Sequence, residues 1–363
     1  MANIAVIDLG FGDSGKGIST SYLCSLYQRS SIVIRANGGH QAGHTVHHNG
    51  FSHVFSQFGS GTLQGIPTYI SKYCTIYIPS LLREYEYIKQ FNPILLIDPM
   101  TMITLPIDID YNRTLESERT DKHGSVGMGF GATIERNERH FNLYFKDLLV
   151  ESVFRAKIKN IIKYCYNGIC DSDTDSVMVE FINKCLEFVQ NHWVEMQNYD
   201  YINSMFQHHI FESAQGILLD QHHGFFPNVT RSNTTSKNIL EMSTLDEIFY
   251  VTRTYQTRHG NGFMTNEGKE IILKNAENET NKRHDYQGEF RIAPLDVDLL
   301  VYSLITDNVY SNSVMKNLII TCMDQYEIDV SNLVEILEFR TGIVFQSIYT
   351  SSGPDSKTIV KFR

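Results

Sequence analysis

The residues with the clearest chemical potential lie near the amino terminus, where positions 10–17 read GFGDSGKG. A glycine turn between a strand and a helix exposes backbone N–H groups that bind phosphate, and Lys16 adds a positive charge. Asp13 places a carboxylate in the same turn, while Gly17 stands where P-loop proteins carry the Ser or Thr that binds Mg²⁺. The turn therefore predicts a phosphate site with an acid–base group. A tight turn without a ligand is the alternative interpretation.

A second glycine-rich stretch, NGGHQAGHTV at residues 37–46, follows an apolar run at 31–35. Loops at the carboxyl ends of parallel strands gather at one edge of a sheet, so this stretch should lie beside the glycine turn. We therefore expect His40 and His44 near Asp13, where an imidazole can supply a proton or a positive charge near neutral pH.

The elements that must position these loops are short apolar runs alternating with amphipathic segments. Residues 3–9 predict a buried strand, 18–27 a helix and 31–35 a second strand, which together form a parallel α/β unit. Further strands are predicted at 75–79, 94–98, 209–212, 318–321 and 344–349. The pattern predicts an α/β fold: one large domain over residues 1–363, with a central mostly parallel sheet, a P-loop-like glycine turn and a helical insertion at about 147–200. Apolar side chains at helical spacing in that insertion are expected to be core: Phe181, Cys185, Phe188, Val189 and Trp193.

Composition narrows the classes of function. The formal net charge of −10 argues against a broad nucleic-acid-binding surface. The six cysteines show neither a paired framework nor zinc-type spacing, which is typical of reduced thiols in the cytosol. No apolar run reaches membrane-spanning length. We therefore expect a cytoplasmic protein, in the host cytoplasm if a phage encodes it, that binds neither nucleic acid nor membrane.

A third stretch, FESAQGILLDQHHGFFPNVTRSNTT at residues 211–235, joins an apolar strand to a loop rich in hydroxyl and amide groups. TRTYQTRHGNGFMTN at 252–266 and SSGPD at 351–355 follow it. These blocks, with the two glycine-rich stretches, occur in the same order in adenylosuccinate synthetases, and the chain resembles that family over nearly its whole length. It is shorter than the common bacterial members. The resemblance implies a large α/β domain that works as a homodimer.

The resemblance also implies a two-step reaction on a 6-oxopurine nucleotide. Asp13 takes the N1 proton, and O6 attacks the γ-phosphate of a nucleoside triphosphate, giving a 6-phosphoryl intermediate. The amine of L-aspartate then displaces that phosphate at C6. His44 would supply charge or a proton as charge develops on the phosphoryl oxygens. Asp13, the backbone of Gly43 and phosphate oxygens would hold Mg²⁺.

The resemblance assigns residues to each ligand. The implied catalytic residues are Asp13, His44 and Lys16. Those implied to contact the substrate nucleotide are Ser14, Asn37, Gly39, Ser125, Arg139, Gln215 and Thr230. Those implied to contact the triphosphate are Gly12, Gly15, Lys16, Gly17, Gly43, His44, Thr45, Asp324, Ser352, Gly353 and Pro354. Those implied to bind aspartate are Thr280, Lys282 and Arg283. Arg139 would reach the 5′-phosphate of a neighbouring subunit; a solvated charged face is the alternative.

Three departures from the family pattern bear on the substrates. The aspartate-binding stretch keeps one arginine, Arg283, where the family has a run of them. At the triphosphate base site Asp324 is present, but Cys322 replaces the lysine of members that use GTP. Ser14 replaces the usual glutamate after the catalytic acid, which we expect to free space near C2 of the purine, where guanine carries an amino group. Capping of the following helix is the alternative role for Ser14.

These departures predict a phage-type branch of the family that joins L-aspartate to dGMP, with ATP or dATP favoured over GTP as phosphate donor. The product would be the succinyl precursor of a 2-aminoadenine deoxynucleotide. An ordinary adenylosuccinate synthetase acting on IMP with GTP is the alternative within the family. A P-loop-like kinase or GTPase switch, and a catalytically inactive nucleotide-binding scaffold, are alternatives of other classes.

Overall fold

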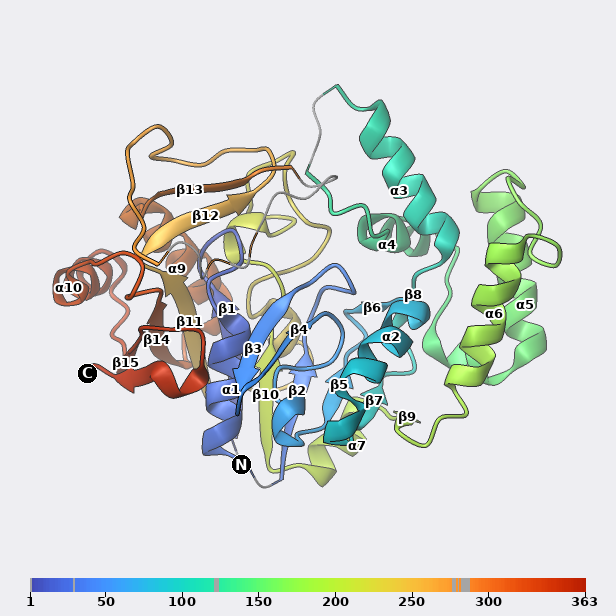
Figure 1. The fold of residues 1–363 in the computed structure, drawn as a ribbon, viewed down its shortest axis with the longest axis horizontal. Helices are drawn as coiled ribbons and strands as arrows, with labels where there is room; N and C mark the ends of the chain where they lie inside the picture. The colour runs from blue at the N-terminus through green and yellow to red at the C-terminus, as the bar shows by residue number, and fades with distance from the viewer. Residues whose placement is uncertain (1, 29, 121–123, 276–278, 280, 282–287) are drawn as a thin grey trace.

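The computed structural model describes residues 2–28, 30–120, 124–275, 279, 281 and 288–363 (Figure 1). In this part of the chain a ten-stranded sheet has the order β16-β15-β14-β11-β1-β10-β2-β5-β7-β9. Its neighbouring strands are parallel, apart from β16, which pairs antiparallel with β15. The strands of this sheet are β1 (Ala2–Asp8), β2 (Ser31–Arg35), β5 (Thr68–Ile70), β7 (Leu95–Ile97), β9 (Val194–Met196), β10 (His208–Glu212), β11 (Glu247–Arg253), β14 (Met315–Thr321), β15 (Ser347–Ser351) and β16 (Ile359–Lys361).

The inner strands are apolar along their length because helices cover both faces of the sheet. Residues 3–8 of β1 and all of β2 are buried. The helix α1 (Lys16–Leu26) packs on one face through Leu23 and Cys24. On the other face lie α9 (Val297–Ser311) and α10 (Val330–Thr341), whose buried leucines and valines pack with apolar side chains of β1, β11 and β14.

The remaining helices flank this framework (Figure 1). They are α2 (Ile78–Ile88), α3 (Pro106–Glu118), α4 (Phe130–Glu138), α5 (Glu151–Asn160), α6 (Ser176–Phe188), α7 (Tyr199–Met205) and α8 (Lys237–Leu240), with short helical turns at 62–64, 89–91, 145–149, 161–165, 217–219 and 356–358. Three two-stranded sheets accompany them: β3 (His44–His48) with β4 (Phe51–Phe55), β6 (Thr75–Ile76) with β8 (Met102–Ile103), and β12 (Tyr255–His259) with β13 (Phe290–Pro294). None of the helices in the described ranges is long and apolar enough to cross a membrane.

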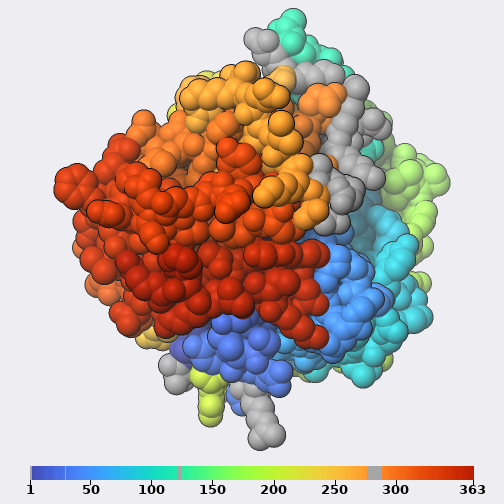
Figure 2. All heavy atoms as spheres, turned by 60° about the vertical axis from the view of Figure 1, so that its left-hand side comes forward, coloured from blue at the N-terminus to red at the C-terminus, as the bar shows by residue number. Residues whose placement is uncertain are grey.

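Segments from the two ends of the chain adjoin over one face. In the space-filling view the carboxyl-terminal part (orange to red) lies directly beside the first hundred residues (blue to cyan; Figure 2). The strand order explains this arrangement, because β1 sits between β11 and β10 in the middle of the sheet.

The predicted α/β class with a mostly parallel central sheet is confirmed. The strand expected at 75–79 is wrong: only Thr75–Ile76 pair, outside the central sheet, and Ile78 and Pro79 begin α2. The block expected to be helical at 147–200 contains α5 and α6, but also β9, which pairs with β7 at the edge of the sheet. The strand expected at 344–349 lies instead at 347–351. The apolar residues predicted to be core in that block are buried, except Val189, which packs against the cluster while partly exposed.

Candidate functional site

The candidate site lies at the carboxyl edge of the central sheet, where adjacent parallel strands end in polar residues. In sheet order these ends are Thr321 of β14, Arg253 of β11, Asp8 of β1, Glu212 of β10 and Arg35 of β2. All five are buried. Open parallel sheets bind ligands at this edge, because the loops that leave the strands converge there.

The glycine turn after β1 has a tightly constrained backbone. Gly12, Asp13 and Gly15 all have left-handed φ angles of 98°, 58° and 93°. Aspartate tolerates this conformation better than most residues with a Cβ. Side chains from neighbouring strand ends fix the turn: Arg253 Nε donates to the Asp13 carbonyl oxygen at 2.6 Å, and Thr321 Oγ1 donates to the Ser14 carbonyl oxygen at 2.9 Å. Contacts from β11 and β14 thus fix the backbone of the turn and leave the Asp13 side chain available for other contacts.

Asp8, which sequence reasoning missed, fixes the turn through hydrogen bonds to its carboxylate. Its carboxylate accepts hydrogen bonds from the Gly10 N–H (2.8 Å), the Ser14 N–H (3.1 Å) and the Ser14 hydroxyl (2.8 Å). It also accepts a bond at 2.8 Å from Lys16 Nζ, and neither side chain of this ion pair is appreciably exposed. A charged residue at the end of an otherwise apolar strand was the available signal, since a buried charge needs a partner.

This arrangement gives Ser14 a contact that was not anticipated. The side chain is buried against Asp8 and lines neither cavity described below. The alternative role for Ser14, capping of the following helix, is wrong: Gly15 is the N-cap of α1, and no side chain caps that helix. In this structure Ser14 ties the turn to the strand that precedes it.

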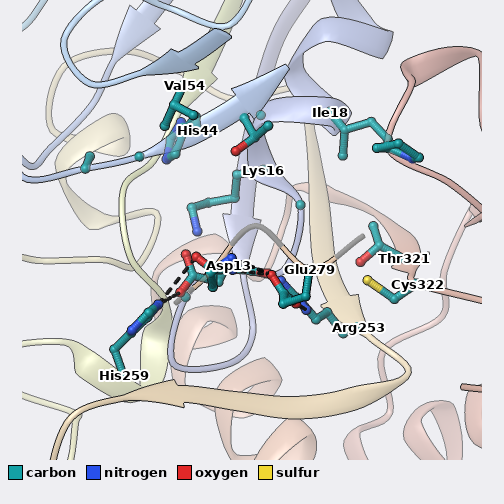
Figure 3. Close-up of a pocket in the computed structure, with 18 of the residues that line it drawn as sticks. Asp13, Lys16, Ile18, His44, Val54, Arg253, His259, Glu279, Thr321 and Cys322 are labelled. Atoms are coloured by element: carbon teal, nitrogen blue, oxygen red, sulfur yellow. Dashed lines mark hydrogen bonds and ion pairs between the residues drawn. The ribbon is translucent and has the colours of Figure 1, made fainter. Parts of the chain in front are cut away.

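Asp13 is paired with His259, at the end of β12 (Figure 3). Nε2 of His259 lies 3.2 Å from Oδ2 of Asp13. Burial raises the pKa of Asp13, but the hydrogen bond to His259 and the charges of His259, Lys16 and Arg253 outweigh it, so that the pKa falls below its usual value. Burial lowers the pKa of His259, and Asp13 more than reverses this, so that the pKa of the imidazole is raised. Asp13 is therefore ionised and able to accept a proton or bind a cation.

His44 is oriented by a buried carboxylate. Its Nδ1 lies 2.7 Å from Oε1 of Glu212, which also accepts hydrogen bonds from the Ser60 N–H and hydroxyl and lies 3.7 Å from Arg35. Burial raises the pKa of Glu212, yet His44 and Arg35 outweigh it and lower the pKa to about 2. Because Glu212 is an acceptor, Nδ1 carries the proton, which leaves Nε2 for the cavity. Burial lowers the pKa of His44, so the protonated ring is a stronger acid than free histidine.

Two cavities meet at this site. The large cavity, of about 480 Å³, contains Asp13, Lys16 and His44 (Figure 3). The small cavity, of about 200 Å³, lies between the end of α3, the segment around Ser125 and the loop that carries Thr230. Residues that line both are Gln41, Val126, Gln215, Leu219 and His259. Two ligands bound in these cavities would meet beside Asp13 and His259.

The large cavity collects most of the residues predicted for the triphosphate. Those that line it are Gly12, Gly15, Lys16, Gly17, Gly43, His44, Thr45, Asp324, Gly353 and Pro354. Ser352 does not, and its side chain is exposed. Cys322 lines the cavity beside Asp324, with a left-handed φ of 63°.

The residues predicted for the substrate nucleotide divide into two groups. Ser125, Thr230 and Gln215 line the small cavity. Asn37 and Gly39 line neither of the two cavities; the Asn37 amide instead bonds the backbone of Ala214, with Nδ2 donating at 3.1 Å and Oδ1 accepting at 2.7 Å. Arg139 is exposed, over the ring of Phe141, and lines neither cavity of its own chain.

His40 was expected beside Asp13 and does not line the large cavity. It is buried against Tyr77, with ring centroids 5.1 Å apart. Burial, and next the charge of Arg83, lower its pKa to about 3, so this ring is neutral. The residues predicted to bind aspartate, Thr280, Lys282 and Arg283, lie outside the described residues.

The donor set fits Mg²⁺ in one respect. Mg²⁺ keeps water and phosphate ligands and takes one or two protein carboxylates. Asp13 supplies one ionised carboxylate in the large cavity, and the Gly43 backbone borders the same space. Among the described residues no cluster of three or more His, Cys, Asp or Glu side chains could hold a metal by itself. The described side chains would therefore hold a metal here only together with other ligands, such as the oxygens of a bound phosphate.

Comparisons with known proteins agree on one family. A family model described as adenylosuccinate synthetase matches residues 5–334. The adenylosuccinate synthetase of Saccharophagus degradans is 31% identical over 283 residues, covering 72% of this chain and 64% of the relative. That of Thermoplasma volcanium is 29% identical over 329 residues, covering 84% and 72%. The chain thus spans less than two thirds of the first relative's length.

Two solved structures share the fold. The fully ligated adenylosuccinate synthetase of Plasmodium falciparum superposes with a TM-score of 0.79 at 17% identity, covering 99% of both chains. The succinoaminodeoxyadenylate synthetase of cyanophage S-2L, bound to dGMP and to dATP as an energy donor, superposes with a TM-score of 0.68 at 17% identity, covering 99% of this chain and 95% of that one. Identities this low establish the likeness of the fold alone.

Proposed function

The chain belongs to the adenylosuccinate synthetase family, and from that premise we propose that it is a ligase joining L-aspartate to C6 of dGMP with hydrolysis of ATP or dATP. The observation that carries this proposal is that the two cavities meet at His259, which pairs with the ionised carboxylate of Asp13, while Asp13, Lys16 and His44 line the large cavity. A phosphate donor in the large cavity and a purine nucleotide reaching from the small cavity would face each other there.

The proposed chemistry assigns a task to each of these side chains. Asp13 accepts the N1 proton of the purine, so that electron density moves to O6, which attacks the γ-phosphorus while the nucleoside diphosphate leaves. Lys16 and the N–H groups of the glycine turn stabilise the charge on the transferred phosphoryl group. His44 donates from Nε2 to the phosphoryl oxygens when its ring carries both protons, a state that the Glu212 carboxylate on Nδ1 favours. The aspartate amine then attacks C6 and phosphate departs.

Mg²⁺ is part of this proposal. Asp13 and the Gly43 backbone would hold the ion together with phosphate oxygens, and the ion would neutralise charge on the triphosphate. Asp13 is thus the one described side chain proposed both to accept a proton and to bind the metal.

The preference for dGMP rests on two supports. One is Ser14 in place of the family's glutamate. Because Ser14 directly follows Asp13 and binds Asp8 through both its N–H and its hydroxyl, the substitution changes how Asp13 is held against the purine edge. The other is the shared fold of the cyanophage enzyme, which binds dGMP and dATP. An ionised glutamate at position 14 has no hydroxyl to donate to Asp8 and could not make the same contact.

The preference for an adenine triphosphate rests on Cys322. A guanine site uses a carboxylate against N1 and N2 with further polar contacts, and here Asp324 is flanked by a thiol instead of an ammonium group. Aspartate, the remaining substrate, is proposed to bind Thr280, Lys282 and Arg283. Of the described residues in this stretch of sequence, Glu279 and Asn281 line the large cavity.

The competing candidate is an ordinary adenylosuccinate synthetase that converts IMP with GTP, since the relatives of the chain by sequence carry that name. Turnover of dGMP, GMP and IMP, each with aspartate, Mg²⁺ and either ATP or GTP, separates the two. We expect the highest kcat/KM with dGMP and ATP, and a succinylated purine as product. A preference for IMP with GTP would establish the competing function. Nucleoside diphosphate released without a succinylated product would contradict both.

A further inference from the structure

Asp13 is held at two points by residues far from it in the chain. Its backbone carbonyl is fixed by Arg253 at 2.6 Å. Its carboxylate has one described hydrogen-bonding partner, His259, through Oδ2 at 3.2 Å. The backbone contact cannot set the torsion of the side chain, so the orientation of the carboxylate depends on His259.

The His259 ring is itself fixed. It packs on Phe290 of the partner strand β13 with ring centroids 4.9 Å apart, and its side chain is 14% exposed. Nε2 also faces Oδ1 of Asn281 at 3.4 Å. The Asn281 amide is oriented because its Nδ2 donates to Glu279 at 2.8 Å, and Glu279 pairs with Arg253. Hydrogen bonds therefore run from Arg253 through Glu279, Asn281 and His259 back to Asp13.

The direction of the contact between His259 and Asp13 follows from this network. Both groups near Nε2 are oxygen acceptors, so Nε2 carries a hydrogen and donates it to Asp13. The other ring nitrogen, Nδ1, is buried and has no hydrogen-bond partner among the described residues. Since His259 lines both cavities, a bound substrate can reach it.

We infer that His259 is a positioning residue for the first chemical step: by binding Oδ2 of Asp13 it presents the other carboxylate oxygen to N1 of the purine. This inference rests on the proposed function, in which Asp13 accepts that proton. A carboxylate that rotates freely would spend little time in the orientation that proton transfer needs, so the loss should appear in kcat more than in KM.

The experiment compares His259→Ala with His259→Gln, whose side-chain amide can donate from a similar distance. His223→Ala is the matched control, because it removes a histidine that is hydrogen-bonded to Tyr310 at 2.9 Å and lines neither cavity. We expect kcat to fall by about 100-fold in His259→Ala with a change in nucleotide KM of less than about threefold. His259→Gln should recover at least about tenfold of that loss, and His223→Ala should behave as wild type.

Three results would overturn the inference: His259→Ala matching His223→Ala in kcat, a rise in KM with kcat unchanged, or equal losses in His259→Ala and His259→Gln. Asp13→Asn separates this outcome from failure of the proposed function. If Asp13→Asn retains turnover, the proton-acceptor role itself is wrong. If Asp13→Asn is inactive while His259→Ala matches the His223→Ala control, the proposed function stands and the positioning role falls. Thermal unfolding of each variant shows whether a loss of kcat accompanies a loss of fold.

Discussion

Nδ1 of His44 lies 2.7 Å from a carboxylate oxygen of Glu212, and this carboxylate has no exposed surface. The contact joins the start of β3 to the end of β10. It selects the tautomer of His44 and aims Nε2 at the large cavity.

We therefore predict that Glu212→Gln lowers kcat by about 100-fold, because a neutral amide no longer selects that tautomer or stabilises the imidazolium. The nucleotide KM values should change little. Steady-state kinetics below the thermal transition give the result. Glu84→Gln is the matched control: Glu84 is also buried and accepts backbone N–H bonds from Ser56 and Gln57, but it lies outside both cavities. Equal kcat values in the two variants would show that Glu212 is structural only.

Asp13→Asn tests the proton acceptor with little disturbance of the turn. Asparagine adopts left-handed backbone angles readily, so the φ of 58° at this position is retained without added strain. We expect kcat to fall by about 10²–10⁴-fold, as general-base catalysis and one Mg²⁺ ligand are lost together. The midpoint of thermal unfolding should stay near that of the wild type. Turnover close to wild type would remove Asp13 from the mechanism.

The choice of triphosphate is tested at Cys322. Introducing the family's lysine in Cys322→Lys adds a cation beside Asp324, where a guanine would bind. We expect the ratio of kcat/KM for ATP to that for GTP to fall by about tenfold. The left-handed φ of 63° at this position is already borne by a residue with a Cβ, so the fold should tolerate the change. An unchanged ratio would mean that the donor base is recognised elsewhere.

Mixing two variants tests whether Arg139 acts across a dimer interface or is only an exposed charged residue. If it reaches the nucleotide of a neighbouring subunit, Arg139→Ala and Asp13→Asn should each be inactive alone. Mixing the two variants would create hybrid dimers with one intact site, so activity should recover to about a quarter of wild type at equal amounts, by the statistics of pairing. Arg136→Ala is not a useful control, because Arg136 is buried on Asp108. Full activity of Arg139→Ala alone would support the solvated-face alternative.

Local patterns in the sequence correctly predict those parts of the fold that depend on residues close together along the chain. The buried strands β1 and β2 are apolar runs, and the glycines of the turn mark the left-handed positions, so the core of the site could be anticipated from residues 3–46. The short strand β9 could not, because three residues carry too little pattern and their pairing with β7 is decided by tertiary packing. The same limit applies to His259 and Arg253, whose contacts with Asp13 join segments at least 240 residues apart along the chain.

The contact between Ser14 and Asp8 leads to a prediction about position 14 that differs from a simple change of volume near the purine. In Ser14→Glu a second carboxylate would enter a buried site where Asp8 already forms an ion pair with Lys16. Two like charges there compete for Lys16 and displace the turn, so kcat/KM should fall by about 100-fold or more for both dGMP and IMP.

Asp8→Asn combined with Ser14→Glu restores a single carboxylate for Lys16. This double variant should recover at least about tenfold of the loss, since the effects of substitutions at residues that share a partner are not additive. In that double variant the effect of a glutamate on the purine can be measured directly, and we expect the ratio of kcat/KM for dGMP to that for IMP to be lower than in the wild type. Asp8→Asn alone is the necessary fourth corner of the cycle. If Ser14→Glu by itself abolishes turnover of dGMP but spares IMP, then position 14 faces the purine when substrate is bound, and the contact with Asp8 does not govern specificity.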